Sequence, residues 1–325
     1  MITVSAPGKL MLFGEHAVLH GQPCIVTALD LRVYVSLERN ESGLISIKTI
    51  TSEGHKEVLS TPVAQLFSLK EFDPQARFVL AAIRRFFAKY KINQGLNVTT
   101  RGPARSYGLG TSSAVTVATL FGLFKLFVRP VLDKELFELA HGAVLDVQKV
   151  GSGFDVASAI YGGTLFFQPG RQVEPIHTNA LPIIIGFSGA KVSTTDLIQV
   201  VEGMRMRQPA QTDQVFRSIG EIVRRARIGM QQKDWQIVGE LANRNQSLLE
   251  SLGVSVENLN SPILAAGQAG ALGAKLSGAG GGDCMFAVVD DRSRQLVEQA
   301  LQSSGAQVLD LQTNDQGVRV ETESA

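Results

Sequence analysis

The apolar residues of the first hundred positions mostly follow the short, alternating pattern of β-strands. A first strand begins at Met1, is interrupted by Pro7-Gly8 and continues through Phe13. Three further runs predict strands, the second as the hairpin partner of the first: residues 24–38, 43–50 and 95–100. The chain therefore opens with a β-rich meander.

Apolar stripes with a helical period dominate the remainder. They predict helices over residues 73–90, 115–127, 133–148, 156–161, 196–204, 211–230, 235–252, 260–271 and 292–302. We expect Asp133 to cap the third of these helices and Pro262 to precede the regular turns of the eighth. Short strands are predicted between the helices, at residues 164–167, 183–187, 284–289, 306–310 and 317–321. Strands first and helices afterwards is an α+β pattern.

The length of the chain indicates two domains, because 325 residues exceed what one hydrophobic core usually serves. A polar stretch with two prolines, residues 172–182, marks the boundary. We therefore expect an N-terminal domain over residues 1–178 and a C-terminal domain over residues 179–325. A hydrophobic content of 44% and a charged content of 19% are typical of a well-packed soluble protein.

Charge and cysteine usage exclude several classes of partner. Basic and acidic residues are balanced, 31 against 30, which argues against nucleic-acid binding. Cys24 and Cys284 are far apart in sequence, so neither a disulfide framework nor a cysteine-rich metal site is indicated. No apolar run reaches the roughly 18–20 residues that span a bilayer, and the N-terminus lacks a signal-peptide pattern. We expect a cytoplasmic protein without a membrane or nucleic-acid partner; a homodimer is compatible with these features.

The stretch Arg-Gly-Pro-Ala-Arg-Ser-Tyr-Gly-Leu-Gly-Thr-Ser-Ser-Ala, residues 101–114, carries the clearest chemistry. Gly108 and Gly110 allow the main chain to turn tightly and approach a ligand closely. The following helix would present free N–H groups and its positive dipole end to an anion such as a polyphosphate. A hydroxyl of Thr111, Ser112 or Ser113 could reach Mg²⁺, which prefers oxygen ligands. The alternative is a plain helix cap without a ligand.

Three more glycine turns meet the end of a helix or strand: residues 151–155, 188–195 and 273–283. Four such turns in both halves of the chain suggest one cleft in which backbone surrounds a ligand with several phosphates. The Walker pattern is absent, and so is a strand–Gly-x-Gly-x-x-Gly–helix unit, which disfavours the P-loop and dinucleotide-binding folds.

Three separated motifs resemble those of the GHMP kinases, the superfamily of galactokinase, homoserine kinase, mevalonate kinase and phosphomevalonate kinase. They are Ala-Pro-Gly-Lys-Leu-Met-Leu-Phe-Gly-Glu-His-Ala-Val-Leu-His-Gly at residues 6–21, the glycine loop at 103–114, and Lys-Leu-Ser-Gly-Ala-Gly-Gly-Gly-Asp-Cys at 275–284. The resemblance implies a two-domain α+β GHMP kinase fold, with an N-terminal domain like ribosomal protein S5 domain 2 and a ferredoxin-like C-terminal domain. It also implies ATP and Mg²⁺ in the cleft between them.

The resemblance assigns roles to residues of this chain. Asp155 would accept the proton of the attacking hydroxyl, although alone it reads as a helix cap, and Lys9 would stabilise phosphate oxygens. Ser112 would hold Mg²⁺, with Ser113 as the alternative. The nucleotide would bind the loop residues Pro103, Tyr107, Gly108, Leu109, Gly110, Thr111, Ser112 and Ser113. The acceptor would contact Glu15, His16, His20, Ser193, Thr194, Gly278, Ala279 and Gly280.

Within the superfamily, Gly-Glu-His-Ala-Val-x-x-Gly is most similar to the mevalonate kinases of the isoprenoid pathway. Gly-Ser-Gly-Phe-Asp at residues 151–155 and Gly-Asp-Cys at 282–284 instead resemble phosphomevalonate kinases. A magnesium-binding glutamate of mevalonate kinases has no evident counterpart, and only Asp146 lies in the corresponding region.

We expect a mevalonate kinase acting on a small-molecule alcohol. Phosphomevalonate kinase is the alternative and would need extra cations, for which Lys149, Arg105 and Lys191 are the candidates. A catalytically silent binding protein of the same fold is the second alternative. Retention of both Lys9 and Asp155 argues against it.

Overall fold

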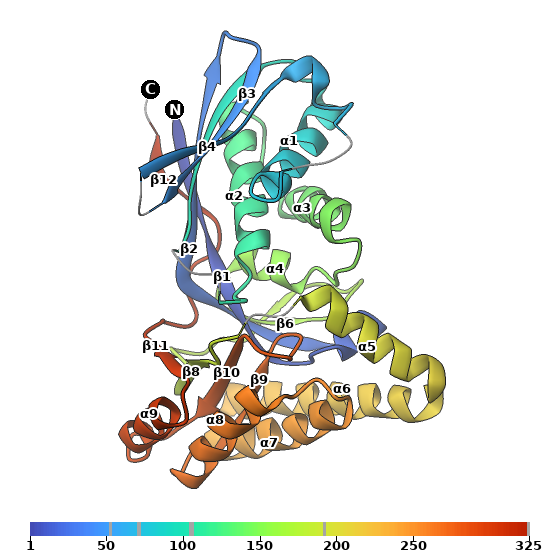
Figure 1. Cartoon of the computed structure of the whole chain (residues 1–325), viewed down its shortest axis with the longest axis vertical. Helices are drawn as coiled ribbons and strands as arrows, with labels where there is room; N and C mark the ends of the chain where they lie inside the picture. Colours follow the sequence, from blue (N-terminus) through green and yellow to red (C-terminus); the bar gives the residue numbers. More distant parts are fainter. Residues whose placement is uncertain (52–53, 70–72, 104–106, 191–192, 324–325) are drawn as a thin grey trace.

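The computed structural model describes residues 1–51, 54–69, 73–103, 107–190 and 193–323. The described residues form two sheets, each covered by helices, and the two layered units lie one above the other in Figure 1. This confirms the α+β, two-domain architecture. Arg105 and Lys191 lie outside the described residues.

The N-terminal sheet has the strand order β12-β1-β2-β5-β3-β4. Two short strands, β6 and β7, extend it beside the first part of β2. Its strands are β1 (Ile2–Phe13), β2 (Cys24–Asn40), β3 (Leu44–Thr51), β4 (Gly54–Pro62), β5 (Gly95–Arg101), β6 (Thr164–Phe167), β7 (Glu174–Pro175) and β12 (Arg319–Glu323). The long strand β2 pairs with β1 along one edge, and with β6 and then β5 along the other.

Two strand predictions for this sheet were wrong. The first strand is continuous through Pro7-Gly8, where the pairing with β2 shifts register instead of breaking. The segment at 43–50 is a strand, but it pairs antiparallel with β4 and parallel with β5, not with the strand before it. Alternation of side chains shows that a strand is half-buried, but it does not identify its partner.

Helices cover one face of this sheet (Figure 1). They are α1 (Arg77–Tyr90), α2 (Thr111–Leu126), α3 (Asp133–Gln148) and α4 (Phe154–Tyr161), and short 3₁₀ turns occur at Ala17–His20 (η1) and Val63–Gln65 (η2). Helix α2 is apolar around most of its circumference because it packs between the sheet and helices α1 and α3. Asp133 is the first helical residue of α3, while Leu132 occupies the cap position without a capping side chain.

The C-terminal unit is an antiparallel sheet of order β11-β8-β10-β9 with helices packed against it. Its strands are β8 (Ile183–Phe187), β9 (Gly273–Ser277), β10 (Cys284–Val288) and β11 (Gln307–Leu309). Its helices are α5 (Thr194–Arg207), α6 (Pro209–Gln232), α7 (Trp235–Ser251), α8 (Glu257–Gln268) and α9 (Arg294–Ser303). Pro262 lies inside α8, so this helix begins earlier than predicted. The sequence reading also missed β9, whose residues were assigned to a glycine-rich turn.

The last strand returns to the first domain. β12 pairs antiparallel with β1, so residues 319–323 belong to the N-terminal sheet and not to the C-terminal domain that was expected to extend to residue 325. Figure 1 shows β12 at this edge, close to the N-terminal end of the chain. The segment between β11 and β12, residues 310–318, therefore connects the two units; we call it the crossing segment.

A continuous apolar core joins the two units. Leu10, Leu12 and Phe13 of β1 belong to the same buried cluster as the strands and helices of the C-terminal unit. The rings of Phe13 and Phe286 meet edge to face across the junction, with centroids 6.4 Å apart. Within the described residues, no helix combines the length and apolar character needed to cross a bilayer.

Candidate active site

A cavity of about 220 Å³ lies where β1, η1 and the starts of α2, α4 and α5 meet the glycine turn after β9. Both units contribute to its walls. The described lining residues are Lys9, Met11, His16, Val18, Leu19, Gly108, Gly110, Thr111, Ser112, Ser113, Gln148, Val150, Gly151, Ser152, Phe154, Asp155, Thr194, Ile198, Gly278, Ala279 and Asp283. The four glycine turns predicted to share one cleft thus all contribute to this region, three through glycines and one through Thr194.

The glycine loop before α2 is held directly against Lys9. Gly108 and Gly110 have φ values of 75° and 80°, in the left-handed region that favours glycine. A Cβ at Gly110 would lie 2.6 Å from Cγ of Lys9, so only glycine allows this approach. The Lys9 amide donates a hydrogen bond to the Leu109 carbonyl at 2.7 Å, while the Leu109 side chain itself is buried. Lys9 and the N-terminus of α2 therefore face the same space.

Asp155 is positioned by the first turn of α4. Its Oδ2 accepts a hydrogen bond from the Ser113 hydroxyl, and its Oδ1 accepts one from the Val156 amide at 3.0 Å. The residue at the cap position is Gly153, and no side chain caps the helix. The alternative prediction that Asp155 is only a helix cap is therefore wrong. The Lys9 ammonium lies 5.4 Å from the ring centroid of Phe154, beside Asp155.

Two serines of the loop have different environments. The Ser113 hydroxyl is committed to Asp155, whereas the Ser112 hydroxyl makes no hydrogen bond within the part of the chain that the structure describes. Asp146 is absent from the described lining and forms a surface ion pair with Arg85 at 2.7 Å. Asp283, which the sequence reading did not assign to the site, supplies a second carboxylate to the lining. Hydroxyl and carboxylate oxygens are the donors that Mg²⁺ prefers.

Glu15 lies outside the described lining. It is fully buried and forms an ion pair with Lys275 of β9, which is equally buried. Loss of hydration raises the pKa of Glu15 and lowers the pKa of Lys275, each opposed by the attraction of the partner. Sequence reading missed Lys275 because its partner is 260 positions away. The position of this lysine in an otherwise largely apolar segment could have indicated that it is buried and paired.

His16, the neighbour of Glu15, does line the cavity. Its backbone has a positive φ of 59° with ψ of −47°, and its Nε2 contacts the Ala279 carbonyl at 2.9 Å. Because a carbonyl only accepts, we assign the proton to Nε2. Burial lowers the pKa of His16, so the neutral ring is favoured at neutral pH. His16 thereby links the N-terminal unit to the glycine turn of the C-terminal unit.

Only some of the remaining residues predicted to contact the acceptor line the cavity. Thr194, Gly278 and Ala279 line the cavity, but His20, Ser193 and Gly280 do not. His20 stacks on Phe216 and contacts Glu202 at 2.9 Å; burial is the main cause that lowers its pKa. Ser193 caps α5 by accepting a hydrogen bond from the Asp196 amide. Gly280 packs on the Val254 carbonyl.

Three predicted nucleotide-binding residues also lie outside the lining: Pro103, Tyr107 and Leu109. The Tyr107 ring packs edge to face on Phe187, with centroids 5.2 Å apart, and its carbonyl accepts from the Cys284 thiol. Besides Asp283, the sequence reading did not assign Gln148 or Phe154 to the site. Gln148 lies just before the second glycine turn and Phe154 lies within it, so the turn itself could have indicated both residues.

A glycine loop on a helix N-terminus, facing a lysine and an aspartate between two α+β units, is the arrangement expected of a small-molecule kinase. Family models agree with this class. The "GHMP kinases N terminal domain" model matches residues 77–163, and the "GHMP kinases C terminal" model matches residues 204–307.

Relatives of full length narrow the assignment. A mevalonate kinase of Thermococcus sibiricus is 34% identical, with 98% of each chain covered. A mevalonate kinase of Pyrococcus abyssi is 32% identical, covering 99% of this chain and 98% of the relative. A crystal structure titled as mevalonate kinase has a TM-score of 0.81 at 21% identity, covering 97% of this chain and 100% of the other. The chain belongs to the GHMP kinase family, and these full-length relatives within it are mevalonate kinases.

Proposed function

We propose that this protein transfers the γ-phosphoryl group of ATP to the 5-hydroxyl of mevalonate, yielding 5-phosphomevalonate and ADP in the isoprenoid pathway. The observation that carries the proposal is the placement of Lys9, Asp155 and the Gly108–Gly110 turn around one cavity. Full-length similarity to mevalonate kinases supports the choice of acceptor.

Asp155 is suited to accept the proton of the attacking hydroxyl. The Ser113 hydroxyl and the Val156 amide each donate to one of its oxygens, which fixes the orientation of the carboxylate. As the substrate oxygen bonds to phosphorus, its proton passes to Asp155 and the bond to the ADP oxygen breaks. Lys9 neutralises negative charge on the transferring group, and the N–H groups at the start of α2 hold the remaining phosphates.

The residues present fit a magnesium ion. Ser112 has a hydroxyl available at the phosphate loop, and Asp283 and Asp155 add carboxylate oxygens to the same cavity. We assign Ser112 as the Mg²⁺ ligand, and Asp283 as the carboxylate that replaces the glutamate of mevalonate kinases. The ion would neutralise phosphate charge during transfer. Asp146 is not assigned a metal-binding role, because it lies outside the described lining and pairs with Arg85 on the surface.

Charge favours mevalonate over phosphomevalonate as the acceptor. The described lining contains one lysine, Lys9, and two aspartates, Asp155 and Asp283. A phosphorylated acceptor would bring about two further negative charges and would need cations to balance them. Of the candidates considered for that role, Lys149 is exposed and donates to the Asp146 carbonyl at 2.8 Å. Arg105 and Lys191 lie outside the described residues.

The test is ADP release from ATP with Mg²⁺ and either mevalonate or 5-phosphomevalonate, assayed in parallel. Turnover with mevalonate alone supports the proposal. Turnover with phosphomevalonate alone would mean that the Gly-Ser-Gly-Phe-Asp and Gly-Asp-Cys signatures identify the acceptor. Absence of turnover with both, combined with measurable ATP binding, would support the silent binding protein.

A further inference from the structure

The catalytic lysine motif lies opposite an irregularity in the sheet. Pro7 pairs with Arg32, but the next residue of β1, Gly8, pairs with Leu29. Strand β2 therefore contains two extra residues, Asp30 and Leu31, which form a bulge facing Gly8. Bulges change the direction of a strand and commonly occur beside functional sites.

This bulge and the phosphate loop enclose Gly8 from two sides. A Cβ at Gly8 would lie 3.1 Å from the Leu31 carbonyl and 2.7 Å from the Leu109 carbonyl. The next residue, Lys9, donates its amide to that same Leu109 carbonyl. The position of the bulge therefore determines how β1 carries Lys9 past the phosphate loop.

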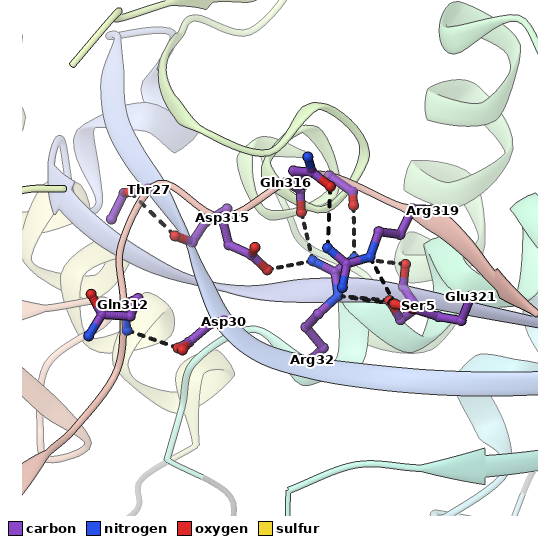
Figure 2. Close-up of polar contacts among 11 residues, drawn as sticks. Ser5, Thr27, Asp30, Arg32, Gln312, Asp315, Gln316, Arg319 and Glu321 are labelled. Atoms are coloured by element: carbon purple, nitrogen blue, oxygen red, sulfur yellow. Dashed lines mark hydrogen bonds and ion pairs between the residues drawn. The ribbon is translucent and has the colours of Figure 1, made fainter. Parts of the chain in front are cut away.

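The crossing segment between β11 and β12 holds the bulge at both of its ends (Figure 2). At one end, the Asp30 amide donates to the Gln312 carbonyl at 3.1 Å, and the Gln312 amide donates to Oδ1 of Asp30 at 2.9 Å. At the other end lies Arg32, whose side chain is 5% exposed.

All five N–H groups of the Arg32 guanidinium have an acceptor. Nε donates to Oγ of Ser5 at 2.7 Å, and Nη2 donates to the carbonyls of Ser5 at 3.1 Å and Gly317 at 2.8 Å. Nη1 donates to Oδ2 of Asp315 at 2.5 Å and to the Gln316 carbonyl at 2.8 Å. A planar fork with five donors is specific to arginine, and lysine cannot reproduce it.

We infer that Arg32, clamped by the crossing segment, is a positioning residue for Lys9. The guanidinium ties β1, β2 and the segment at 315–317 into one unit, so the bulge cannot slide and Gly8-Lys9 stays against the phosphate loop. The C-terminal end of the chain thereby becomes part of the catalytic apparatus without touching the cavity. This inference rests on the proposed kinase function of Lys9.

The experiment compares Arg32→Lys with Arg85→Lys. Arg85 likewise binds a carboxylate in the same unit, through two hydrogen bonds to Asp146, but it contacts α3 instead of β1. We expect Arg32→Lys to lower kcat by about 10- to 100-fold, since displacing a catalytic group by about 1 Å costs up to that much. ATP affinity should remain close to wild type, and Arg85→Lys should leave kcat unchanged.

Hydrogen exchange at the Lys9 amide provides a readout that is independent of turnover. Arg32→Lys should accelerate exchange at Lys9 selectively, while the amides of β10 keep their protection. Asp315→Asn, which preserves shape, should show both effects more weakly and serves if the first variant folds poorly. Wild-type kcat in Arg32→Lys, or a lower kcat with unchanged Lys9 exchange, overturns the inference. If no acceptor is phosphorylated, the exchange measurement still tests the clamp.

Discussion

Lys275 and Glu15 form an ion pair that is fully buried at the junction of the two units. The ammonium of Lys275 also donates to the Leu276 carbonyl and lies 5.9 Å from the ring centroid of Phe13 and 5.4 Å from that of Phe286. Ser277 adds a second link across the junction, donating to the Met11 carbonyl at 2.8 Å. Glu15 therefore joins the two units that form the cavity walls.

Removing one member of this pair should be strongly destabilising. Lys275→Met leaves an uncompensated buried carboxylate, so we expect the free energy of unfolding to fall by about 3–5 kcal/mol. The double variant Lys275→Met with Glu15→Leu should recover most of this loss, because apolar residues can replace a buried pair at little cost. Urea unfolding measures both effects. A single variant as stable as wild type would contradict the structural role of the pair.

Asp155→Asn should abolish the proton transfer while preserving shape. We expect kcat to fall by at least about 10²-fold, since general base catalysis contributes that much or more. ATP binding, measured by calorimetry, should be retained because the amide oxygen of the new side chain can still accept from the Ser113 hydroxyl. The matched control is Asp146→Asn, which removes a surface carboxylate paired with Arg85 and should leave kcat unchanged. Near wild-type turnover in Asp155→Asn would refute the assignment of the base.

Substitutions of the two loop serines should have different effects, one on metal binding and the other on the orientation of the catalytic base. We expect Ser112→Ala to raise the Mn²⁺ concentration that half-saturates the enzyme–ADP complex by about tenfold or more. Mn²⁺ replaces Mg²⁺ in this experiment because its binding can be measured by electron paramagnetic resonance. Ser113→Ala should leave that concentration unchanged and instead lower kcat, because its hydroxyl donates to Asp155 and orients the carboxylate. Equal effects of both variants on Mn²⁺ binding would contradict the assignment of Ser112.

How far the sequence predicted the site depends on the distance between interacting residues. Lys9, Asp155 and the glycine loop were predicted because each belongs to a local motif whose spacing carries its chemistry. The Glu15–Lys275 pair and the Arg32 clamp were not, since their partners are more than 250 positions away and only the fold brings them together. The contacts of His20 with Glu202 and Phe216 were not predicted for the same reason, since both partners are distant in sequence.

Local sequence patterns also predicted the elements of the fold better than their pairing. Strands β6 and β8 and helix α3 were predicted with the bounds that the structure has, because turns punctuate them clearly. The partners of β3 and β12 were beyond local patterns. A half-buried strand has the same alternation whichever neighbour it pairs with.

Acidification should weaken the junction at His16. Burial lowers the pKa of His16 in the folded state below its ordinary value of about 6.5. The folded state therefore favours the neutral ring, and this contribution to stability is present above the unfolded pKa and is lost as pH falls through the folded pKa. His16→Asn removes the titrating group, and asparagine is one of the non-glycine residues found most often at positive φ. Its melting temperature should consequently fall less than that of wild type between pH 7.5 and pH 5, as measured by differential scanning calorimetry at about half-unit steps. His177→Asn, at an exposed histidine, is the matched control and should follow the wild-type curve. If the His16→Asn curve parallels wild type as well, the neutral buried His16 does not contribute to the pH dependence of the fold.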